Sequence, residues 1–248
     1  MNRMEIAGQV AVITGGSGDV GRATAARMLA DGAAVYAFDR NAEALSAAAA
    51  ALPGLRTITV DLLDEPATKA AFARVMSEAG RLDILVNCVG IEGLRAVTEE
   101  QDIAAWRRVM EINVTAPLIA AKYAIPLMRA NDYGRMVFLG STAGKEGNAF
   151  GAAYSASKAA IMTVAKSVGK ELATTGIRVN CVTPAALDSA LYERSSTPAS
   201  RQAGVARIPM GRLGEVDEVA ALICWLCSPD CSFSTGAVFD ISGGRSTY

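Results

Sequence analysis

The stretch Thr14-Gly15-Gly16-Ser17-Gly18-Asp19-Val20-Gly21 decides the fold of this chain. It lies between a β-rich apolar run at Val10–Thr14 and a helical pattern at Val20–Ala30. Glycines allow the backbone to turn tightly and to approach a pyrophosphate, which then lies at the positive end of the helix. A glycine cluster alone is weak evidence, but its place between a strand and a helix makes an ordinary glycine-rich turn the less favoured alternative. The stretch therefore predicts a dinucleotide-binding turn.

Short β-rich runs alternate with longer helical patterns along the rest of the chain. Such βαβ units predict an α/β protein with a doubly wound, mostly parallel, seven-stranded sheet and helices on both faces. The predicted strands are Val10–Thr14, Ala34–Phe38, Thr57–Val60, Ile84–Val89, Arg135–Leu139, Arg178–Val182 and Ala237–Ile241. The predicted helices are Val20–Ala30, Ala42–Leu52, Ala67–Ala79, Ile103–Arg129 (broken into two at Pro117), Ala153–Thr175 and Val216–Leu226. We expect a single domain over 1–248, with an irregular substrate loop near 185–210.

The composition excludes several classes of function. The 248 residues are 51% hydrophobic and 20% charged, with a formal net charge of −1, which offers no electrostatic footprint for nucleic acid. The apolar runs are far shorter than the ~20 residues of a membrane span, and the first residues lack the pattern of a signal peptide. We therefore expect a cytoplasmic protein that binds neither nucleic acid nor a membrane.

The chain has no histidine, which excludes Ser-His-Asp and Cys-His nucleophilic sites and any histidine-ligated metal. Cys224 and Cys227 have the spacing of a redox pair or of half a zinc site. They lie, however, in an apolar helical run, and structural zinc takes four converging ligands. We expect buried, apolar cysteines and no metal.

Tyr154 and Lys158 can replace histidine as the proton-transferring group. They stand at positions i and i+4, which share one face of a helix, and Ser141 precedes them. An ammonium group near a tyrosine, together with a positive nicotinamide, lowers the phenol pKa from its usual value of about 10. The spacing alone is also that of an exposed amphipathic pair. With the glycine turn and Ser141 present, we expect Tyr154 to exchange a proton with a substrate hydroxyl whose oxygen Ser141 stabilises.

Acidic and polar residues follow the predicted strands. Asp39 stands where a carboxylate accepts both adenosine ribose hydroxyls and repels a 2′-phosphate, which favours NAD over NADP. The neighbouring Arg40 could accommodate that phosphate, and Asp39 could instead cap the helix that follows. Asp61 lies within reach of an adenine amino group, and Asn87-Cys88-Val89-Gly90 lets the chain pass beneath a cofactor.

These motifs together resemble the short-chain dehydrogenase/reductase family over essentially the whole chain. The resemblance implies a Rossmann fold, a homotetramer, and a catalytic tetrad of Asn113, Ser141, Tyr154 and Lys158. It also implies that Asn113 positions a water near Lys158 and that Lys158 binds the nicotinamide ribose. The expected cofactor-binding residues are Gly15, Ser17, Gly18, Asp19, Val20, Gly21, Asp39, Arg40, Asp61, Leu62, Asn87, Val89, Gly90, Tyr154, Lys158, Pro184, Leu187 and Ser189.

The chain departs from the family pattern at three places. Asp19 replaces a glycine of the turn, Cys88-Val89 replaces Asn-Ala, and Ala185 replaces the glycine after Pro184. We expect Asp19 to cap the following helix, since aspartate is a strong N-cap and an acid is otherwise unfavourable beside a pyrophosphate. Ala185 should stiffen the loop that leads to the nicotinamide.

A narrower resemblance, to NAD-dependent dehydrogenases of 2-keto-3-deoxy sugar acids, rests on the runs Ser141–Asn148, Val182–Ala186 and Phe239–Tyr248. Similar runs occur in 3-oxoacyl reductases. The resemblance implies an NAD-dependent secondary-alcohol dehydrogenase. The alternatives are a general carbonyl or 3-oxoacyl reductase and, in another class, a non-catalytic dinucleotide-binding module.

Substrate contacts are expected from the segment after the fourth strand and from the loop near 185–210. Arginine forks suit carboxylates, but solvated lid charges are the favoured interpretation of each loop arginine. The loop arginines are Arg194, Arg201 and Arg207. The candidate substrate-binding residues are Glu92, Ser141, Asn148, Tyr154 and Arg194, with Glu146 a further candidate for sugar hydroxyls.

Overall fold

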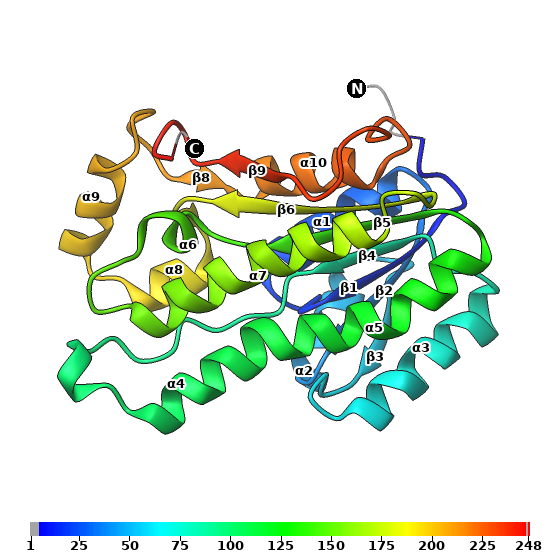
Figure 1. The fold of residues 1–248 in the computed structure, drawn as a ribbon, viewed down its shortest axis with the longest axis horizontal. Helices are drawn as coiled ribbons and strands as arrows, with labels where there is room; N and C mark the ends of the chain where they lie inside the picture. The colour runs from blue at the N-terminus through cyan, green and yellow to red at the C-terminus, as the bar shows by residue number, and fades with distance from the viewer. Residues whose placement is uncertain (1–4, 247) are drawn as a thin grey trace.

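A computed structural model of the chain describes residues 5–246 and 248, and a seven-stranded parallel sheet forms its centre (Figure 1). The strand order is β3-β2-β1-β4-β5-β6-β9, so the chain builds outward from β1, returns to β4 beside β1, and then builds outward the other way. This reversal between β1 and β4 leaves a crevice at the carboxyl ends of the strands. The strands are β1 (Val10–Thr14), β2 (Ala34–Asp39), β3 (Arg56–Thr59), β4 (Ile84–Asn87), β5 (Gly134–Leu139), β6 (Ile177–Pro184) and β9 (Val238–Ile241).

Helices cover both faces of the sheet, which confirms the predicted doubly wound Rossmann architecture. One face carries α3 (Glu65–Ala79), α5 (Ala116–Ala130) and α7 (Ala152–Glu171), and the other carries α1 (Asp19–Ala30), α2 (Ala42–Ala51) and α10 (Val216–Cys227). Alternate strand residues point to opposite faces, so Val12 packs into one core and Ile13 into the other. The strands are therefore continuous apolar runs, because both of their faces are buried.

The segment predicted to be an irregular loop contains regular structure. It forms β7 (Leu187–Asp188), α8 (Ala190–Ser195) and α9 (Pro198–Ala206), and β7 pairs with β8 (Gly214–Glu215). Ser189 caps α8 and Thr197 caps α9. The prediction of an irregular loop is wrong because the serines and threonines that obscured the periodicity are helix caps.

The predicted helix over 103–129 is not interrupted at Pro117. α4 (Ile103–Met110) continues through one π-helical turn, η2 (Glu111–Thr115), into α5. Pro117 has no N–H for the carbonyl of Asn113, four residues earlier. The wider turn, in which the Ala116 N–H donates to the carbonyl of Glu111, accommodates this missing donor. The proline therefore accompanies a bulge in place of the predicted break.

Besides α8 and α9, two further short helices are absent from the sequence prediction. These are η1 (Thr98–Glu100) and α6 (Thr142–Glu146), which begins directly after Ser141. In Figure 1 the arrows of β6 and β9 point toward α6, α8 and α9, so these three helices gather at the carboxyl edge of the sheet. None of the helices in the described residues has the length and apolar character needed to cross a membrane.

Candidate active site

A cavity of about 1200 Å³ opens at the carboxyl edge of the sheet. Its lining extends from the glycine turn and Asp39 to Ser141, Tyr154 and the segment around α8 and α9. The predicted site residues whose side chains are described line this cavity, except the buried Asn87 and Asn113 and the further candidate Glu146. Residues from distant parts of the sequence thus converge on one space, as expected at the switch point of a doubly wound sheet.

The glycine turn packs tightly between β4 and the start of α1. Gly15 has a φ of +62°, and a Cβ there would lie 2.7 Å from the backbone nitrogen of Val89. A Cβ on Gly21 would lie 2.5 Å from the carbonyl oxygen of Gly15. Larger residues at these two positions would force the turn away from the sheet, so the glycines set how closely α1 approaches the cavity.

Asp19 does not cap α1, contrary to the prediction. The N-cap position belongs to Gly18, which has the extended backbone of a cap, and Asp19 is the first helical residue. The Asp19 carboxylate accepts a hydrogen bond from the guanidinium of Arg22 at 2.9 Å. An acid in the first turn interacts favourably with the helix dipole, so helix geometry accounts for this residue.

Asp39 lies at the end of β2 and lines the cavity together with Arg40. Its Oδ2 accepts a hydrogen bond from the Ser17 hydroxyl at 2.6 Å, which ties the carboxylate to the glycine turn. The alternative that Asp39 caps α2 is wrong, because Asn41 is the cap and accepts from the Ala44 N–H. Asp39 therefore has no capping role, and its carboxylate lies at the cavity wall.

Asn87 has a buried donor without a partner. Its Oδ1 accepts from the Thr14 hydroxyl at 3.1 Å, whereas its Nδ2 has no hydrogen-bond partner among the described residues. An unsatisfied buried donor costs on the order of 1–3 kcal/mol. Asn87 directly precedes residues 88–90, which line the cavity, so a polar ligand there could remove this cost.

Ser141, Tyr154 and Lys158 line the same part of the cavity. Ser141 lies two residues after β5 and caps α6, its Oγ accepting from the Ala143 N–H at 3.1 Å. Tyr154 and Lys158 lie one turn apart on α7, with the lysine Nζ 5.7 Å from the centre of the tyrosine ring. Lys158 is only 4% exposed and donates to the carbonyl oxygen of Leu139 at 2.7 Å.

Burial dominates the ionisation of both groups on α7. It raises the pKa of Tyr154 to about 12; the Ser141 side chain partly opposes this rise and the Glu92 carboxylate adds to it. Burial also lowers the pKa of Lys158 to about 8, so the amine is still mostly an ammonium at pH 7. The expected lowering of the tyrosine pKa is thus not found in the protein alone, because the loss of hydration raises that pKa by more than the Ser141 side chain lowers it.

Asn113 lies in the π-helical turn η2 and is 1% exposed. Its amide accepts from the Ile91 N–H at 2.8 Å and donates to the Ile91 carbonyl and the Ser157 hydroxyl, both at 2.9 Å. A Cβ on Gly90 would lie 3.4 Å from both the Asn113 Oδ1 and the Lys158 Nζ. The structure thus brings Asn113 and Lys158 to the same glycine, and the asparagine fastens α7 to the segment after β4.

The remaining substrate candidates separate into different environments. Glu92 and Asn148 line the cavity, whereas the side chain of Arg194, in α8, is outside the described residues. Arg201 does not line the cavity and pairs with Asp188 at 2.8 Å.

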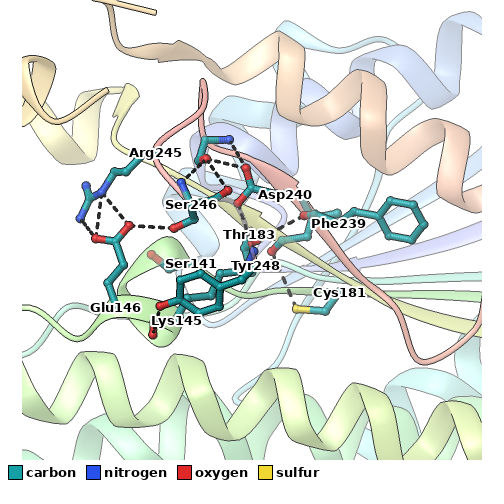
Figure 2. Close-up of polar contacts among 12 residues, drawn as sticks. Ser141, Lys145, Glu146, Cys181, Thr183, Phe239, Asp240, Arg245, Ser246 and Tyr248 are labelled. Carbon is teal, nitrogen blue, oxygen red and sulfur yellow. Dashed lines mark hydrogen bonds and ion pairs between the residues drawn. The ribbon is translucent and has the colours of Figure 1, made fainter. Parts of the chain in front are cut away.

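Arg207 lines the cavity and bonds to Glu146. Glu146 also binds Arg245 and Ser246, as Figure 2 shows. With Arg207, its carboxylate thus accepts from three residues of the chain.

Arg245 is a cavity-lining residue that the sequence reasoning missed. Its side chain is 9% exposed, and its Nε and Nη2 both bond to the Glu146 carboxylate. Its position directly after the last predicted strand could have indicated that it lies at the cavity. Because β9 runs parallel to β6, residues that follow it lie at the same edge of the sheet as Pro184.

The cysteines agree with the apolar interpretation. Cys224 and Cys227 are buried in α10, and all five cysteines are free. Burial raises the pKa of the Cys224 thiol to about 12 and that of Cys227 well above its usual value. Both thiols are therefore unreactive. The described part of the chain has no group of three or more histidine, cysteine or acidic side chains placed to hold a metal.

Comparison with known proteins agrees with this geometry. A family model described as enoyl-(acyl carrier protein) reductase matches residues 16–246. The chain belongs to the short-chain dehydrogenase/reductase family, and it is an oxidoreductase of that family. The resemblance seen in its motifs is thereby confirmed.

Two curated relatives and one solved structure are similar over nearly their whole length. The 2-dehydro-3-deoxy-L-rhamnonate dehydrogenase (NAD(+)) of Sphingomonas sp. (strain SKA58) is 40% identical, over 98% of this chain and 97% of that one. The cis-4-hydroxycyclohexanecarboxylate dehydrogenase of Sinomonas cyclohexanicum is 39% identical, over 95% and 96%. An NAD+-bound xylitol dehydrogenase structure superposes with a TM-score of 0.93 at 30% identity, over 97% of this chain and 100% of that one.

Proposed function

We propose that this protein is an NAD-dependent dehydrogenase that interconverts a secondary alcohol and its ketone. One observation carries the proposal: Ser141, Tyr154 and Lys158 line the same cavity as the glycine turn and Asp39. A substrate oxygen and a dinucleotide can therefore occupy one space. The names of the Sphingomonas relative and of the xylitol dehydrogenase structure, which both include NAD, support the choice of cofactor.

The residues present fit a nicotinamide dinucleotide. The glycine turn and the start of α1 suit a pyrophosphate. The Nδ2 of Asn87, which has no partner among the described residues, can donate a hydrogen bond to a polar group of the cofactor. Asp39 suits the ribose hydroxyls of NAD, with Arg40 and Asp61 beside it at the cavity wall. When bound, the cofactor would accept the hydride in oxidation and supply it in reduction. Pro184, Leu187 and Ser189 would hold its nicotinamide end.

Tyr154 moves the proton in this proposal. Its high pKa keeps the phenol protonated in the free protein, ready to donate to a ketone oxygen in the reducing direction. In the oxidising direction it must act as a base, for which the Lys158 ammonium and a positive ring nearby favour the phenolate. The Ser141 hydroxyl can donate to the same substrate oxygen.

In this proposal Asn113 is a positioning residue and does not react with the substrate. Its side-chain amide holds Ile91 and Ser157, and Pro117 leaves its backbone carbonyl without the usual helical donor. That carbonyl is a suitable acceptor for a water next to Lys158, through which protons could reach solvent.

A 2-dehydro-3-deoxy sugar acid is the substrate class that we favour. The names of both curated relatives describe a carboxylate. Glu92 and Asn148 line the cavity and can bind sugar hydroxyls, while the segment 185–210 forms part of the wall that encloses a substrate. We further propose a single domain over 1–248 that acts as a homotetramer in the cytoplasm; its five free cysteines fit a reducing compartment.

Replacing Tyr154 with phenylalanine tests the proposal. Loss of a general acid–base group should lower kcat by roughly 10²–10⁴-fold, while calorimetry should still detect NAD binding. Tyr123→Phe is the matched control, because Tyr123, in α5, donates to Glu65 at the start of α3 and does not line the cavity. Near-normal turnover by Tyr154→Phe would show that another group moves the proton.

The substrate screen should use NAD and NADP with sugar acids, sugars, cyclic alcohols and 3-hydroxyacyl esters. We expect NAD and a sugar acid to give the highest kcat/KM. A strong preference for NADPH with a 3-oxoacyl ester would favour the general reductase instead. Absence of NAD binding would favour a non-catalytic module.

A further inference from the structure

Two arginines from distant segments meet beside the candidate catalytic serine. Arg207 ends α9, Arg245 follows β9, and both bond to Glu146, the last residue of α6. Ser141 caps the other end of α6, which spans five residues, and thus roughly 8 Å at the rise of an α-helix. Both arginines line the cavity that also holds Ser141 and Tyr154. Figure 2 shows Arg245 and Glu146 next to the helix that leads from Ser141.

The charges of this cluster do not balance. Two guanidinium groups share the single carboxylate of Glu146, with Nη2 of Arg207 at 2.9 Å and Nη2 of Arg245 at 2.8 Å. The other donor to Glu146 is the neutral hydroxyl of Ser246, at 2.7 Å. The adjacent Lys145 is neutralised by Asp240 at 3.2 Å. The cluster therefore keeps a net charge of +1 at the cavity wall.

Other charged residues of the cavity wall do not cancel this charge. Arg108 pairs with Glu111, and Arg95 donates to the carbonyl of Ala149. Glu92 also lines the cavity, but among the described residues it forms an ion pair with neither arginine of the cluster. Its carboxylate acts instead on Tyr154, whose pKa it helps to raise.

Both guanidinium groups retain unused donors. Arg245 bonds to Glu146 through Nε and Nη2, and Arg207 through Nη2 alone. Within the described part of the chain, Nη1 of Arg245 and both Nε and Nη1 of Arg207 have no acceptor. Arg245 is 9% exposed and is also 3.5 Å from the Asn148 Oδ1, so its orientation is set before any ligand arrives. A pre-positioned guanidinium loses little entropy on binding a carboxylate.

We propose that Arg207 and Arg245 form a subsite for the carboxylate of the substrate, held in place by Glu146. This inference rests on the proposed function and deepens it, because it selects hydroxy and oxo acids over neutral sugars and alcohols. The acid group binds at the end of α6 while the reacting oxygen lies at Ser141, at its start. The substrate thus carries its carboxylate a few bonds away from the carbon that changes oxidation state.

The test compares 2-dehydro-3-deoxy-L-rhamnonate with its methyl ester, which has the same shape without the charge. Calorimetry on the NADH-loaded protein, which cannot oxidise the alcohol, should give an affinity for the acid at least about tenfold higher than for the ester. Arg207→Met should weaken acid binding by about 10- to 100-fold, the usual range for a charge-assisted hydrogen bond, and leave ester binding unchanged. Because Arg207 is half exposed, this variant should fold normally.

Arg245→Met should weaken acid binding at least as much, and Arg201→Met is the matched control. Arg201 lies in α9, the helix that Arg207 directly follows. It pairs with Asp188 and does not line the cavity. Equal affinity for acid and ester in the unaltered protein would overturn the subsite. So would an Arg207→Met variant that loses both ligands equally, which is the result expected of a purely structural ion pair.

Turnover separates this inference from the proposed function. If neutral alcohols are oxidised with NAD but the acid has no advantage that depends on Arg207, the subsite is wrong and the dehydrogenase stands. If the acid binds in an Arg207-dependent way but no substrate is turned over, the subsite stands and the dehydrogenase is wrong.

Discussion

Lys158 is a buried lysine at the wall of the cavity. It is 4% exposed, its Nζ donates to the Leu139 carbonyl, and burial lowers its pKa from 10.5 to about 8. A difference of that size corresponds to roughly 3 kcal/mol against the charged form. In the mechanism that we propose, this cost has a function, because an ammonium near Tyr154 would favour the phenolate that alcohol oxidation requires.

This cost should appear in the pH dependence of stability. Between about pH 8 and pH 10.5 the unfolded chain binds a proton at Lys158 that the folded protein does not, so raising the pH stabilises the folded state. The free energy of unfolding should therefore rise by roughly 3 kcal/mol relative to Lys158→Met across that window, with no change in the difference below pH 8. Urea unfolding of both proteins at several pH values measures it. Parallel curves would mean that Lys158 titrates as an exposed lysine.

The π-helical turn η2 is the element that places Asn113. It inserts a wider turn between α4 and α5 where Pro117 cannot donate to the Asn113 carbonyl. Bulges of this kind are frequent at functional sites. The local cost of the proline and the wide turn is offset by the hydrogen bonds that Asn113 makes to Ile91 and Ser157.

Pro117→Ala should therefore harm activity more than stability. Alanine restores an N–H that can bond to the Asn113 carbonyl, which favours a regular α-turn and shifts the asparagine. We expect kcat to fall by about tenfold or more, as for other displaced positioning groups, with an unchanged or higher Tm. Pro126→Ala is the matched control, because Pro126 lies in the same helix α5 away from η2. Full activity in Pro117→Ala would separate the bulge from catalysis.

The short helices are the elements that the sequence did not predict. Long helices such as α3 and α7 were predicted within a few residues, because their periodic apolar faces extend over several turns. α6 has about one turn, and α8 and α9 bury few side chains. Their stability therefore comes from the caps Ser141, Ser189 and Thr197 and from contacts with other segments.

The whole molecule exposes apolar side chains on the outer face of α4 and α5. Ile103 is 56% exposed and Leu118 is 45% exposed. If the proposed tetramer buries these helices, light scattering should give about four times the chain mass of 25.7 kDa. Leu118→Glu should lower the assembly to dimers or monomers, because a carboxylate in an apolar interface loses its hydration.

Leu94→Glu is the control for that prediction. Leu94 is 64% exposed but lies in the segment between β4 and η1, outside α4 and α5. The same mass for Leu118→Glu and the unaltered protein would exclude this face from the assembly, and a monomeric unaltered protein would contradict the tetramer.

The sequence by itself determined the order of strands and helices, the glycine turn and the Tyr154/Lys158 pair. These features are local: a buried parallel strand is a continuous apolar run, a tight turn needs glycine, and residues four apart share a helix face. Ser141 was identified from its place before that pair and from the family resemblance, and in the structure it lies just after β5, at the start of α6.

Only the tertiary structure decided which distant residues touch and how charged groups respond. Arg245 and Glu146 are 99 residues apart in the chain and meet because β9 and α6 end at the same edge. The high pKa of Tyr154 comes from burial by several segments at once, which opposes the effect expected from Lys158 alone. Contact and hydration depend on three-dimensional packing, and no local pattern in the sequence encodes either.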